Sequence, residues 1–328
     1  MAGVEELVNT LQKKFGKEVV AGNHQQGVNF VTSGSIGLDL ALGGGYPLGR
    51  VIEMRGYESS GKTTLALTAC ANVQKQTGKA VLYVDRENAI DLDYAEALGV
   101  DISPDKFVLT QPATAEECLE IIREGVKSTA IGAIVQDSVA AMFPRCYLDG
   151  DVGDAKMGVL ARLMSQWLPG IISDAKRNET LVIFINQYRD KIGVMYGSPK
   201  TTPGGKALGF YASQILDIAK SGTVGEKGEE SAIHVKVRVE KNKVAPPLRK
   251  AEFDIRFGEG IDSYGELLEL AVEYEVVEKK GAFYRYNGEL LGQGVERVRQ
   301  AIAEDVTTHE KIHGEVMSKI VQVWNLSI

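Results

Sequence analysis

The chain has 328 residues, of which 44% are hydrophobic and 25% charged, and its formal net charge is -7. This apolar content excludes an intrinsically disordered chain, and the length predicts one large α/β domain with a smaller one. No run approaches the roughly 20 consecutive apolar residues of a membrane helix, and three widely spaced cysteines without a C-x-x-C pair predict reduced thiols in a cytoplasmic protein.

At the start of the chain, Val4, Leu7, Leu11 and Phe15 recur at helical spacing, and Gly16 is placed to end the helix. An amphipathic helix has to bury its apolar stripe against another surface. The linker at residues 22–27 gives the helix reach. The sequence therefore leaves two alternatives for the surface that covers the helix: its own domain or a neighbouring subunit.

From residue 31 to about residue 264, apolar strands alternate with helical stretches. The early strands are continuously apolar, as expected for parallel strands buried on both faces. The last two alternate in polarity and are separated by Pro246 and Pro247, which predicts antiparallel edge strands. We expect the strands at residues 51–54, 80–84, 107–109, 133–135, 181–185, 215–218, 233–239 and 251–257.

A run of the form G-x-x-x-x-G-K-T joins the strand at 51–54 to a helix at 65–73. Glycines let backbone N–H groups surround phosphate oxygens, and the helix N-terminus adds partial positive charge. Lys62 is expected to reach the β- and γ-phosphates and Thr63 to bind Mg²⁺. The alternative is a strand-to-helix turn with a chance lysine. We predict a nucleoside triphosphate site formed by Gly56, Glu58, Ser59, Ser60, Gly61, Lys62, Thr63 and Thr64.

Polar side chains follow three of the apolar strands. Glu87 follows residues 80–84 and is expected to orient water for attack on the γ-phosphate. Asp137 follows residues 133–135 and is expected to hold Mg²⁺ through its water shell. Gln187 follows residues 181–185, where an amide can sense the γ-phosphate. Any one of them alone is equally compatible with a cap or turn residue, but together they predict a catalytic site.

After residue 260 the pattern changes to helices and a short hairpin at 281–287, and we place a small α+β domain at 265–328. His309, Glu310 and His313 match H-E-x-x-H, which on a helix can hold zinc. No His, Cys or acidic residue follows Glu315, and a domain this small is expected to offer no cleft. A surface helix face is the preferred interpretation of the motif.

Over nearly its whole length the chain resembles the bacterial-type RecA recombinases. The absence of an acidic C-terminal tail is compatible with a divergent or phage-encoded member. The resemblance implies a P-loop NTPase core with a mainly parallel sheet at 31–264, after an N-terminal oligomerisation helix and linker at 1–30. It rests on matches at residues 33–35, 38–39, 56–64, 85–94, 137–141, 153–154, 157–158, 184–187, 191–197, 210–213, 241–243 and 258–260.

The resemblance further implies a helical filament on DNA with ATP and Mg²⁺ bound between subunits. Lys241 and Lys243 then match the lysines that reach a neighbour's phosphates, which makes hydrolysis depend on assembly. Asp91, Tyr94 and Tyr264 match positions near the nucleotide. The resemblance assigns Phe210, with Leu7 and Leu11, to the subunit interface.

Two segments match the DNA-binding loops of the family, at about 149–157 and 188–205. The second is glycine-rich and basic, and its apolar and aromatic residues can wedge or stack between bases. The first is acidic. Lys220, Lys236 and Arg238 resemble a second site for double-stranded DNA, and a solvated surface is the alternative for them. The residues implied to contact single-stranded DNA are Met157, Arg162, Ser165, Arg189, Lys191, Val194, Met195, Tyr196, Gly204, Gly205 and Lys206.

The sequence departs from the family pattern in places. Pro169 and Gly170 stand where the family continues a helix with a basic DNA contact. Arg86 stands between two carboxylates and is expected to perturb them. Gln136 puts an amide into an apolar strand. A ring-forming helicase or clock-type ATPase on the same core, and a DNA-coating protein without enzymatic activity, are the other function classes.

Overall fold

The computed structural model describes residues 2–16, 27–147, 158–190, 200–225 and 228–324. In this part of the chain, nine strands form one large sheet in the order β13-β12-β11-β10-β3-β7-β6-β4-β5. Six strands are parallel: β3 (Val51–Gly56), β4 (Ala80–Asp85), β5 (Phe107–Thr110), β6 (Ile131–Asp137), β7 (Leu181–Gln187) and β10 (Gln214–Val224). Three antiparallel strands extend them: β11 (Ala232–Asn242), β12 (Lys250–Arg256) and β13 (Gly260–Ile261).

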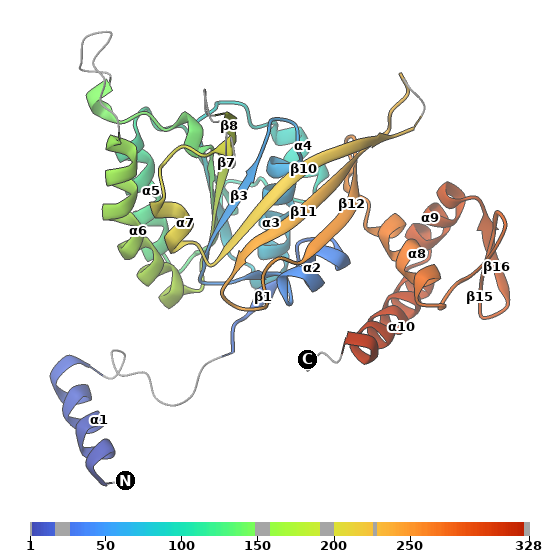
Figure 1. The fold of residues 1–328 in the computed structure, drawn as a ribbon, viewed down its shortest axis with the longest axis horizontal. Helices are drawn as coiled ribbons and strands as arrows, with labels where there is room; N and C mark the ends of the chain where they lie inside the picture. The colour runs from blue at the N-terminus through green and yellow to red at the C-terminus, as the bar shows by residue number, and fades with distance from the viewer. Residues whose placement is uncertain (1, 17–26, 148–157, 191–199, 226–227, 325–328) are drawn as a thin grey trace.

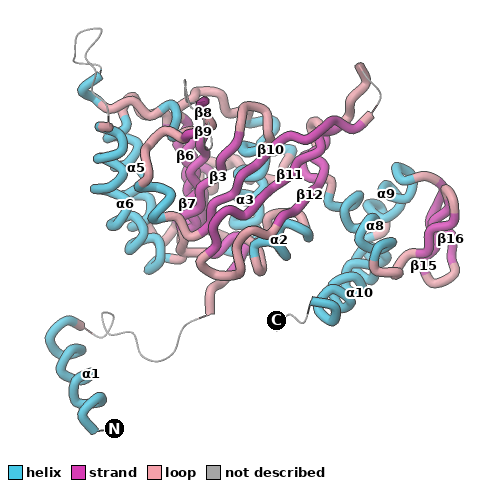
Figure 2. The backbone as a smooth tube through the Cα atoms, in the orientation of Figure 1, coloured by secondary structure: helices cyan, strands magenta, loops and turns pink. Residues whose placement is uncertain are grey.

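Helices cover both faces of this sheet (Figures 1 and 2). On one face, Leu65 and Leu67 pack with Tyr83 in one buried cluster. On the other, Leu119 and Met164 pack with strand residues in a second cluster. The first face carries α2 (Ile36–Leu42), α3 (Lys62–Thr77) and α4 (Leu92–Ala97), and the second α5 (Ala115–Lys127), α6 (Val159–Asn178) and α7 (Ala207–Tyr211). The predicted mainly parallel α/β sheet is therefore confirmed.

The strands are longer than their apolar runs, because pairing continues into the polar residues that follow. The antiparallel pairing of the two late strands is confirmed, but only β12 lies next to the short edge strand β13, and β11 is internal. The predicted end of the first of them at residue 239 is wrong, because β11 continues to Asn242 and so includes Lys241. The short elements are β1 (Phe30–Val31), β2 (Tyr46–Pro47), β8 (Arg189–Asp190), β9 (Lys200–Thr201) and two 3-10 turns at Val139–Ala141 and Arg145–Tyr147.

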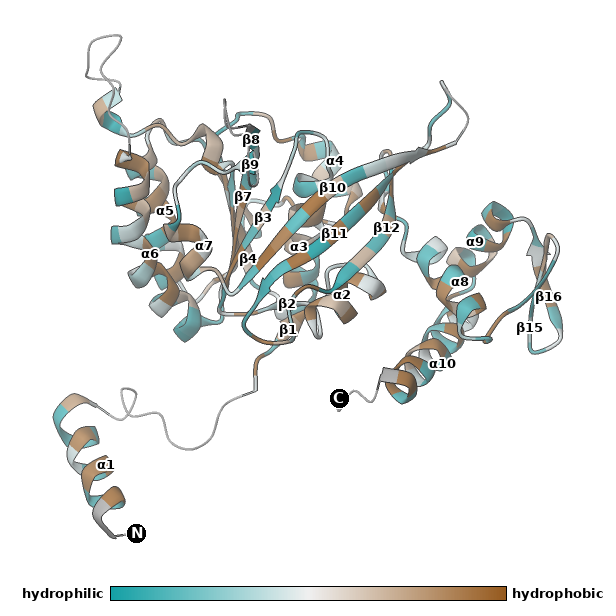
Figure 3. Ribbon diagram, viewed as in Figure 1, coloured by the Kyte–Doolittle hydropathy of each residue, from teal (hydrophilic) through white to brown (hydrophobic). Residues whose placement is uncertain are grey.

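The N-terminal helix α1 (Ala2–Phe15) ends where predicted, and Gly16 adopts a left-handed φ of 96°. Several turns of its ribbon have the brown colour of hydrophobic residues in Figure 3. Val4, Leu7 and Phe15 are exposed, and Leu11 is half-buried. One of the two alternatives was burial of the whole apolar stripe on the helix's own domain. Among the described residues this burial is not observed.

A small α+β domain follows the large one. It contains α8 (Ser263–Glu273), α9 (Val295–Glu304), α10 (Val306–Trp324) and a sheet of β14 (Glu278–Lys280), β15 (Phe283–Tyr286) and β16 (Glu289–Gln293). The expected hairpin thus gains a third strand. The domain has its own buried cluster, which includes Leu267, Tyr284 and Ile312. In the described residues, no helix has the length and apolar character needed to cross a membrane.

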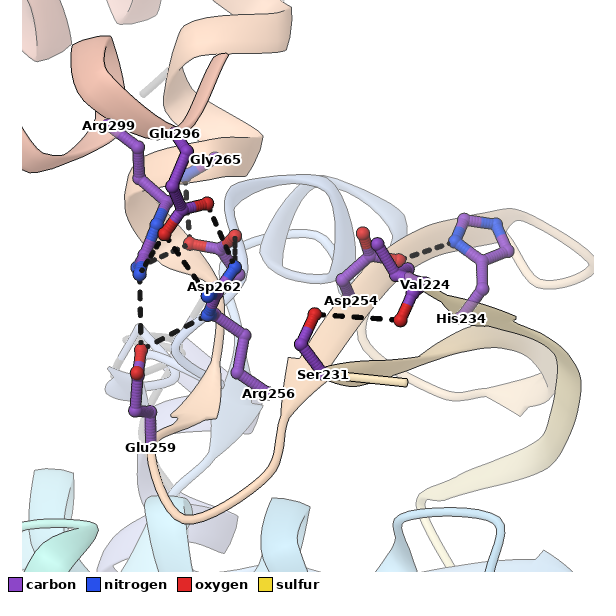
Figure 4. Close-up of polar contacts among 10 residues, drawn as sticks. All are labelled: Val224, Ser231, His234, Asp254, Arg256, Glu259, Asp262, Gly265, Glu296 and Arg299. Carbon is purple, nitrogen blue, oxygen red and sulfur yellow. Dashed lines mark hydrogen bonds and ion pairs between the residues drawn. The ribbon is translucent and has the colours of Figure 1, made fainter. Parts of the chain in front are cut away.

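Charged side chains connect the end of β12 to α9 (Figure 4). Arg256 donates to both carboxylate oxygens of Glu296 at 3.3 and 3.1 Å. Arg299 donates to Asp262 at 3.3 Å and to Glu259 at 3.3 Å. Asp262 also caps α8 by accepting from the Gly265 amide at 3.0 Å. This network fixes the small domain to the strand end that leads into it.

Candidate active site

The glycine-rich loop joins a strand to a helix as the sequence predicts, but β3 continues past residue 54 to Gly56, and α3 begins at Lys62 rather than at residue 65. A Cβ at Gly56 would lie 2.3 Å from the Ile218 carbonyl oxygen, and one at Gly61 would lie 2.6 Å from Ile255 Cδ1. Gly61 also has a φ of 93°. Both glycines are therefore required by close packing, and Gly61 also by its backbone conformation.

The ammonium group of Lys62 lies inside the curve of this loop. Its Nζ donates to the Tyr57 carbonyl oxygen at 2.5 Å and to Ser60 Oγ at 3.4 Å. Burial lowers the pKa of Lys62, while the charges of Asp137, Glu87 and Glu58 act in the opposite direction. Among the described residues this buried cation donates to neutral oxygens, which fits a phosphate group whose negative charge would replace these contacts.

A second group of polar atoms joins α3 to the end of β6. Thr63 Oγ1 donates to Asp137 Oδ2 at 3.1 Å, and the Tyr83 hydroxyl donates to the same oxygen at 2.8 Å. Burial raises the pKa of Asp137 to about 6, and the Glu87 charge adds to this shift. Hydroxyl and carboxylate oxygens are the ligands that Mg²⁺ prefers, so this pair fits the predicted metal. Tyr83 was not predicted as a site residue, because its position in an apolar strand indicates only a buried core residue.

The predicted strand-end residues of β4 and β7 are in contact. Gln187 Nε2 donates to Glu87 Oε1 at 2.7 Å, and the Ser138 hydroxyl donates to the same oxygen. Asp85 accepts from the amides of Glu87 and Ile90 at 3.1 and 3.2 Å, which holds the loop that carries Glu87. The structure thus brings the proposed water-orienting carboxylate and the amide sensor together beside the phosphate loop.

A pocket of about 310 Å³ lies against the loop, lined by residues 59–64, by Tyr94 and by a wall formed by Ile233 with residues 255–258. Tyr94 donates to or accepts from Thr64 Oγ1 at 3.0 Å, and Asp91 caps α4 by accepting from the Tyr94 amide. Exposed Glu58 lies beside the pocket, outside its lining. Tyr264 does not line this pocket either, because its ring packs edge-on against His309 with centroids 5.3 Å apart.

Lys241 and Lys243 lie away from this pocket. Lys241 Nζ donates to the carbonyl oxygens of Gly209 and Phe210 at 2.7 and 2.8 Å, and Lys243 Nζ donates to Phe210 at 3.5 Å. Burial lowers the pKa of Lys241, and the Lys243 charge adds to this. Phe210 is 71% exposed. Two cations, one at the end of β11 and one just after it, thus lie beside the exposed Phe210 of α7.

Several predicted DNA contacts lie in described segments. Arg162 and Ser165 are exposed on α6, and Ser165 Oγ donates to the Ala161 carbonyl oxygen at 2.8 Å. Arg189 and Lys206 are exposed near the ends of β7 and α7. Gly204 and Gly205 have φ values of 83° and 70°, which favour glycine. Met157, Lys191, Val194, Met195 and Tyr196 lie outside the described residues.

The three departures from the family pattern all lie in described segments. Helix α6 continues through Pro169 and Gly170, so the chain keeps a helix at this position. Arg86 lies 6.0 Å from the Phe143 ring centroid. Gln136 is fully buried, and both its amide atoms lack hydrogen-bond partners among the described residues.

The histidine motif lies on α10. The rings of His309 and His313 stack with centroids 6.0 Å apart, and Glu310 is exposed. The expectation that the small domain offers no cleft is wrong, because both histidines line a cavity of about 990 Å³ shared with α2 of the large domain. In the described ranges no three His, Cys, Asp or Glu side chains gather as a metal site.

Comparison with known proteins agrees with this geometry. A family model described as the RecA N-terminal domain matches residues 2–262, and one described as the RecA C-terminal domain matches residues 265–321. The RecA protein of Gloeobacter violaceus is 50% identical over 317 residues, covering 96% of this chain and 85% of that protein. The RecA protein of Arthrospira platensis is 48% identical over 320 residues, covering 97% and 87%.

A crystal structure of the RadB recombinase matches with a TM-score of 0.53 and 24% identity, over 71% of this chain and 98% of that one, which supports the fold. Together, the sheet and the glycine-rich loop define a P-loop fold of the recombinase type. The matches to both domains and to whole-length relatives then show that the chain belongs to the RecA family.

Proposed function

We propose that this ATP-dependent recombinase forms a helical filament on single-stranded DNA and catalyses homologous pairing and strand exchange, with DNA-stimulated hydrolysis of ATP. One observation carries the proposal. Glu87 and Gln187 are joined by a 2.7 Å hydrogen bond beside the phosphate loop, and Gln187 leads directly into the hairpin of β8 and β9. The proposed catalytic group is thus hydrogen-bonded to the residue that precedes the proposed DNA-binding segment.

In this proposal ATP and Mg²⁺ are held by the residues already in place. The loop amides and Lys62 bind the phosphates, Thr63 and Asp137 bind the metal, and Tyr94 offers a face to the base. The metal supplies positive charge on the phosphate oxygens. Glu87 orients the attacking water, and Gln187 reports occupancy of the γ-phosphate position to the strand end that follows it.

The neighbouring subunit completes the site. Lys241 and Lys243 do not line the pocket of their own chain and donate instead to backbone carbonyl oxygens of α7, which supports the proposal that the phosphates they reach belong to another copy. The exposed residues Phe210 and Leu7, with half-buried Leu11, are the proposed assembly contacts. Tyr264 contributes to the nucleotide site only if its contact with His309 changes on assembly.

Two surfaces are proposed to bind DNA. The primary site for single strands is built around β8, β9 and α6, with Arg162, Arg189 and Lys206 supplying charge. Lys220, Lys236 and Arg238 form the proposed duplex site. Lys236 pairs with Glu252 at 3.1 Å and Arg238 with Glu240 at 3.4 Å, so DNA has to compete with these carboxylates. The proposed compartment is the cytoplasm.

A strand-exchange assay tests the proposal, using circular single-stranded DNA, homologous linear duplex, ATP and Mg²⁺. The proposal predicts nicked circular product with wild-type protein and none with Lys62→Ala. Electron microscopy with single-stranded DNA and a non-hydrolysed ATP analogue provides the second readout. Continuous helical filaments are expected, whereas closed rings with no exchange product would assign the chain to the helicase class.

A further inference from the structure

Three side chains form a cluster between the phosphate loop and the β8–β9 hairpin. The rings of Tyr57, in the loop, and Tyr188, after β7, have centroids 5.6 Å apart. Lys200, in β9, places its Nζ 5.1 Å from the Tyr57 centroid and 4.9 Å from the Tyr188 centroid. One cation therefore contacts two rings, and each contact is a favourable cation–π arrangement.

A backbone hydrogen bond holds Tyr188 in this place. Its amide donates to the Gly56 carbonyl oxygen at 3.2 Å, which ties it to the start of the phosphate loop. Asp217, on strand β10 beyond β3, lies close enough to its hydroxyl that burial and the Asp217 charge raise the pKa of Tyr188.

The cluster also reaches the phosphate-binding lysine. Lys62 Nζ donates to the carbonyl oxygen of Tyr57 at 2.5 Å. A bound phosphate would draw this ammonium away, because a charged acceptor forms the stronger hydrogen bond. The Tyr57 peptide would then lose a partner, while its ring stays in contact with Tyr188 and Lys200.

On the other side, the cluster is part of a hairpin stem. Asp190 pairs with Lys200 and Arg189 pairs with Thr201 across β8 and β9. A displacement of the Tyr57 ring therefore acts on Lys200, and through it on the pairing of the stem. Such coupling is reciprocal, because a hairpin that favours one position of Lys200 also favours one state of the loop.

We propose that Tyr57, Tyr188 and Lys200 are positioning residues that couple occupancy of the phosphate loop to the β8–β9 hairpin, and so make binding of single-stranded DNA depend on nucleotide. The DNA part rests on the function proposed above. The cluster acts in addition to Gln187: it connects to the loop backbone and to Lys62, whereas Gln187 contacts Glu87.

The test measures dissociation constants of a fluorescein-labelled oligo-dT by anisotropy, without nucleotide and with a non-hydrolysed ATP analogue and Mg²⁺. The ratio of the two constants is the coupling factor. Lys200→Met keeps the aliphatic stem and removes the charge, and is expected to lower this factor about three- to tenfold, the scale of one or two cation–π contacts. Lys200→Arg retains a cation and is expected to keep the wild-type factor.

Lys206→Met is the matched control, because Lys206 is an exposed lysine close in sequence that contacts no ring among the described residues. It is expected to weaken DNA binding equally in both conditions and to leave the factor unchanged. If Lys200→Met behaves in the same way, Lys200 is a simple DNA contact and the inference is wrong. Tyr188→Leu, which removes no charge, is expected to reproduce the lowered factor.

A second measurement needs no DNA. Hydrogen exchange at Arg189 and Thr201 is expected to change when the analogue binds wild-type protein, and not when it binds Lys200→Met. An unchanged exchange pattern in wild-type protein overturns the inference while leaving the proposed function intact. If wild-type protein binds no DNA but shows the exchange effect, the proposed function fails and the coupling of loop to hairpin stands.

Discussion

The carboxyl edge of the large sheet and helix α10 of the small domain both carry polar residues in a recognisable catalytic pattern. At the sheet edge, side chains from α3, β4, β6 and β7 meet: Thr63 contacts Asp137, and Gln187 contacts Glu87. On α10, His309 contacts both His313 and Tyr264, and Glu310 is exposed. The first pattern is completed by other elements, whereas in the described residues the second involves no third ligand.

The difference shows what gives a motif its chemistry. Parallel strands bring their carboxyl ends to one edge, so residues far apart in sequence become neighbours. A single helix can align two histidines, but further ligands have to come from elsewhere. We expect substitutions at the sheet edge to change catalysis and those in the small domain to change stability.

The largest effect is expected for Glu87→Gln. Loss of the carboxylate that orients water should lower the hydrolysis rate about 10²- to 10⁴-fold, the usual scale for general base catalysis. Binding of ATP and DNA should persist, because the amide keeps the shape of the side chain. A DNA-stimulated phosphate-release assay measures this, with Glu96→Gln on α4 as an exposed control. Near-normal turnover would place water activation at another residue.

Lys62→Ala tests the phosphate loop. Removing the ammonium group should weaken binding of a fluorescent ATP analogue about 10- to 100-fold, because hydrogen bonds to charged groups contribute about 1.5–3 kcal/mol. Lys75→Ala removes an exposed lysine from the same helix and should leave affinity unchanged. Equal affinities for wild type and Lys62→Ala would contradict the assignment of the pocket.

In the small domain, Arg299→Ala should act on stability. Its side chain is 15% exposed and pairs with Asp262, Glu259 and Glu296. Loss of this partly screened network should reduce the free energy of unfolding by about 1 kcal/mol, measured by urea denaturation at low salt. Arg297→Ala, exposed on the same helix, is the control. A fall in DNA-stimulated turnover without a change in stability would contradict the division between the two regions.

The smallest effect is expected from pH. Burial lowers the pKa of His313, and the His309 charge adds to this. The unfolded chain therefore binds a proton at His313 more readily than the folded chain does. The stability that the neutral ring contributes is present above about pH 6.5, and it is lost as the pH falls from there toward the pKa of the folded state. His313→Gln should reduce the slope of unfolding free energy against pH and leave hydrolysis unchanged. Zinc bound in stoichiometric amount by wild-type protein would contradict the assignment of α10 as structural.

The sequence predicts the strands and the residues at their carboxyl ends, because an apolar run followed by Asp137 or Gln187 is a local signal. It does not predict that residues 255–258 form the far wall of the nucleotide pocket. That contact depends on β11 and β12 extending the sheet past β10, which is decided by strand order.

No local sequence pattern predicts the cluster of Tyr57, Tyr188 and Lys200 either. The three residues are far apart in sequence, and each taken alone reads as a surface position. The contact of Tyr264 with His309 is similar, since it depends on how α8 and α10 pack. Contacts of this kind follow from tertiary packing, which neither periodicity nor motif spacing describes.

The most direct test of a catalytic site shared between subunits mixes two inactive proteins. Glu87→Gln lacks the water-orienting group, and the double variant Lys241→Ala with Lys243→Ala lacks the cations proposed to reach a neighbour's phosphates. In a mixed filament some interfaces contain both intact halves. Our account predicts that DNA-stimulated hydrolysis returns in part, with a maximum at intermediate mixing ratios. No recovery at any ratio, with co-assembly demonstrated by energy transfer between labelled proteins, would contradict a site completed by the neighbouring subunit.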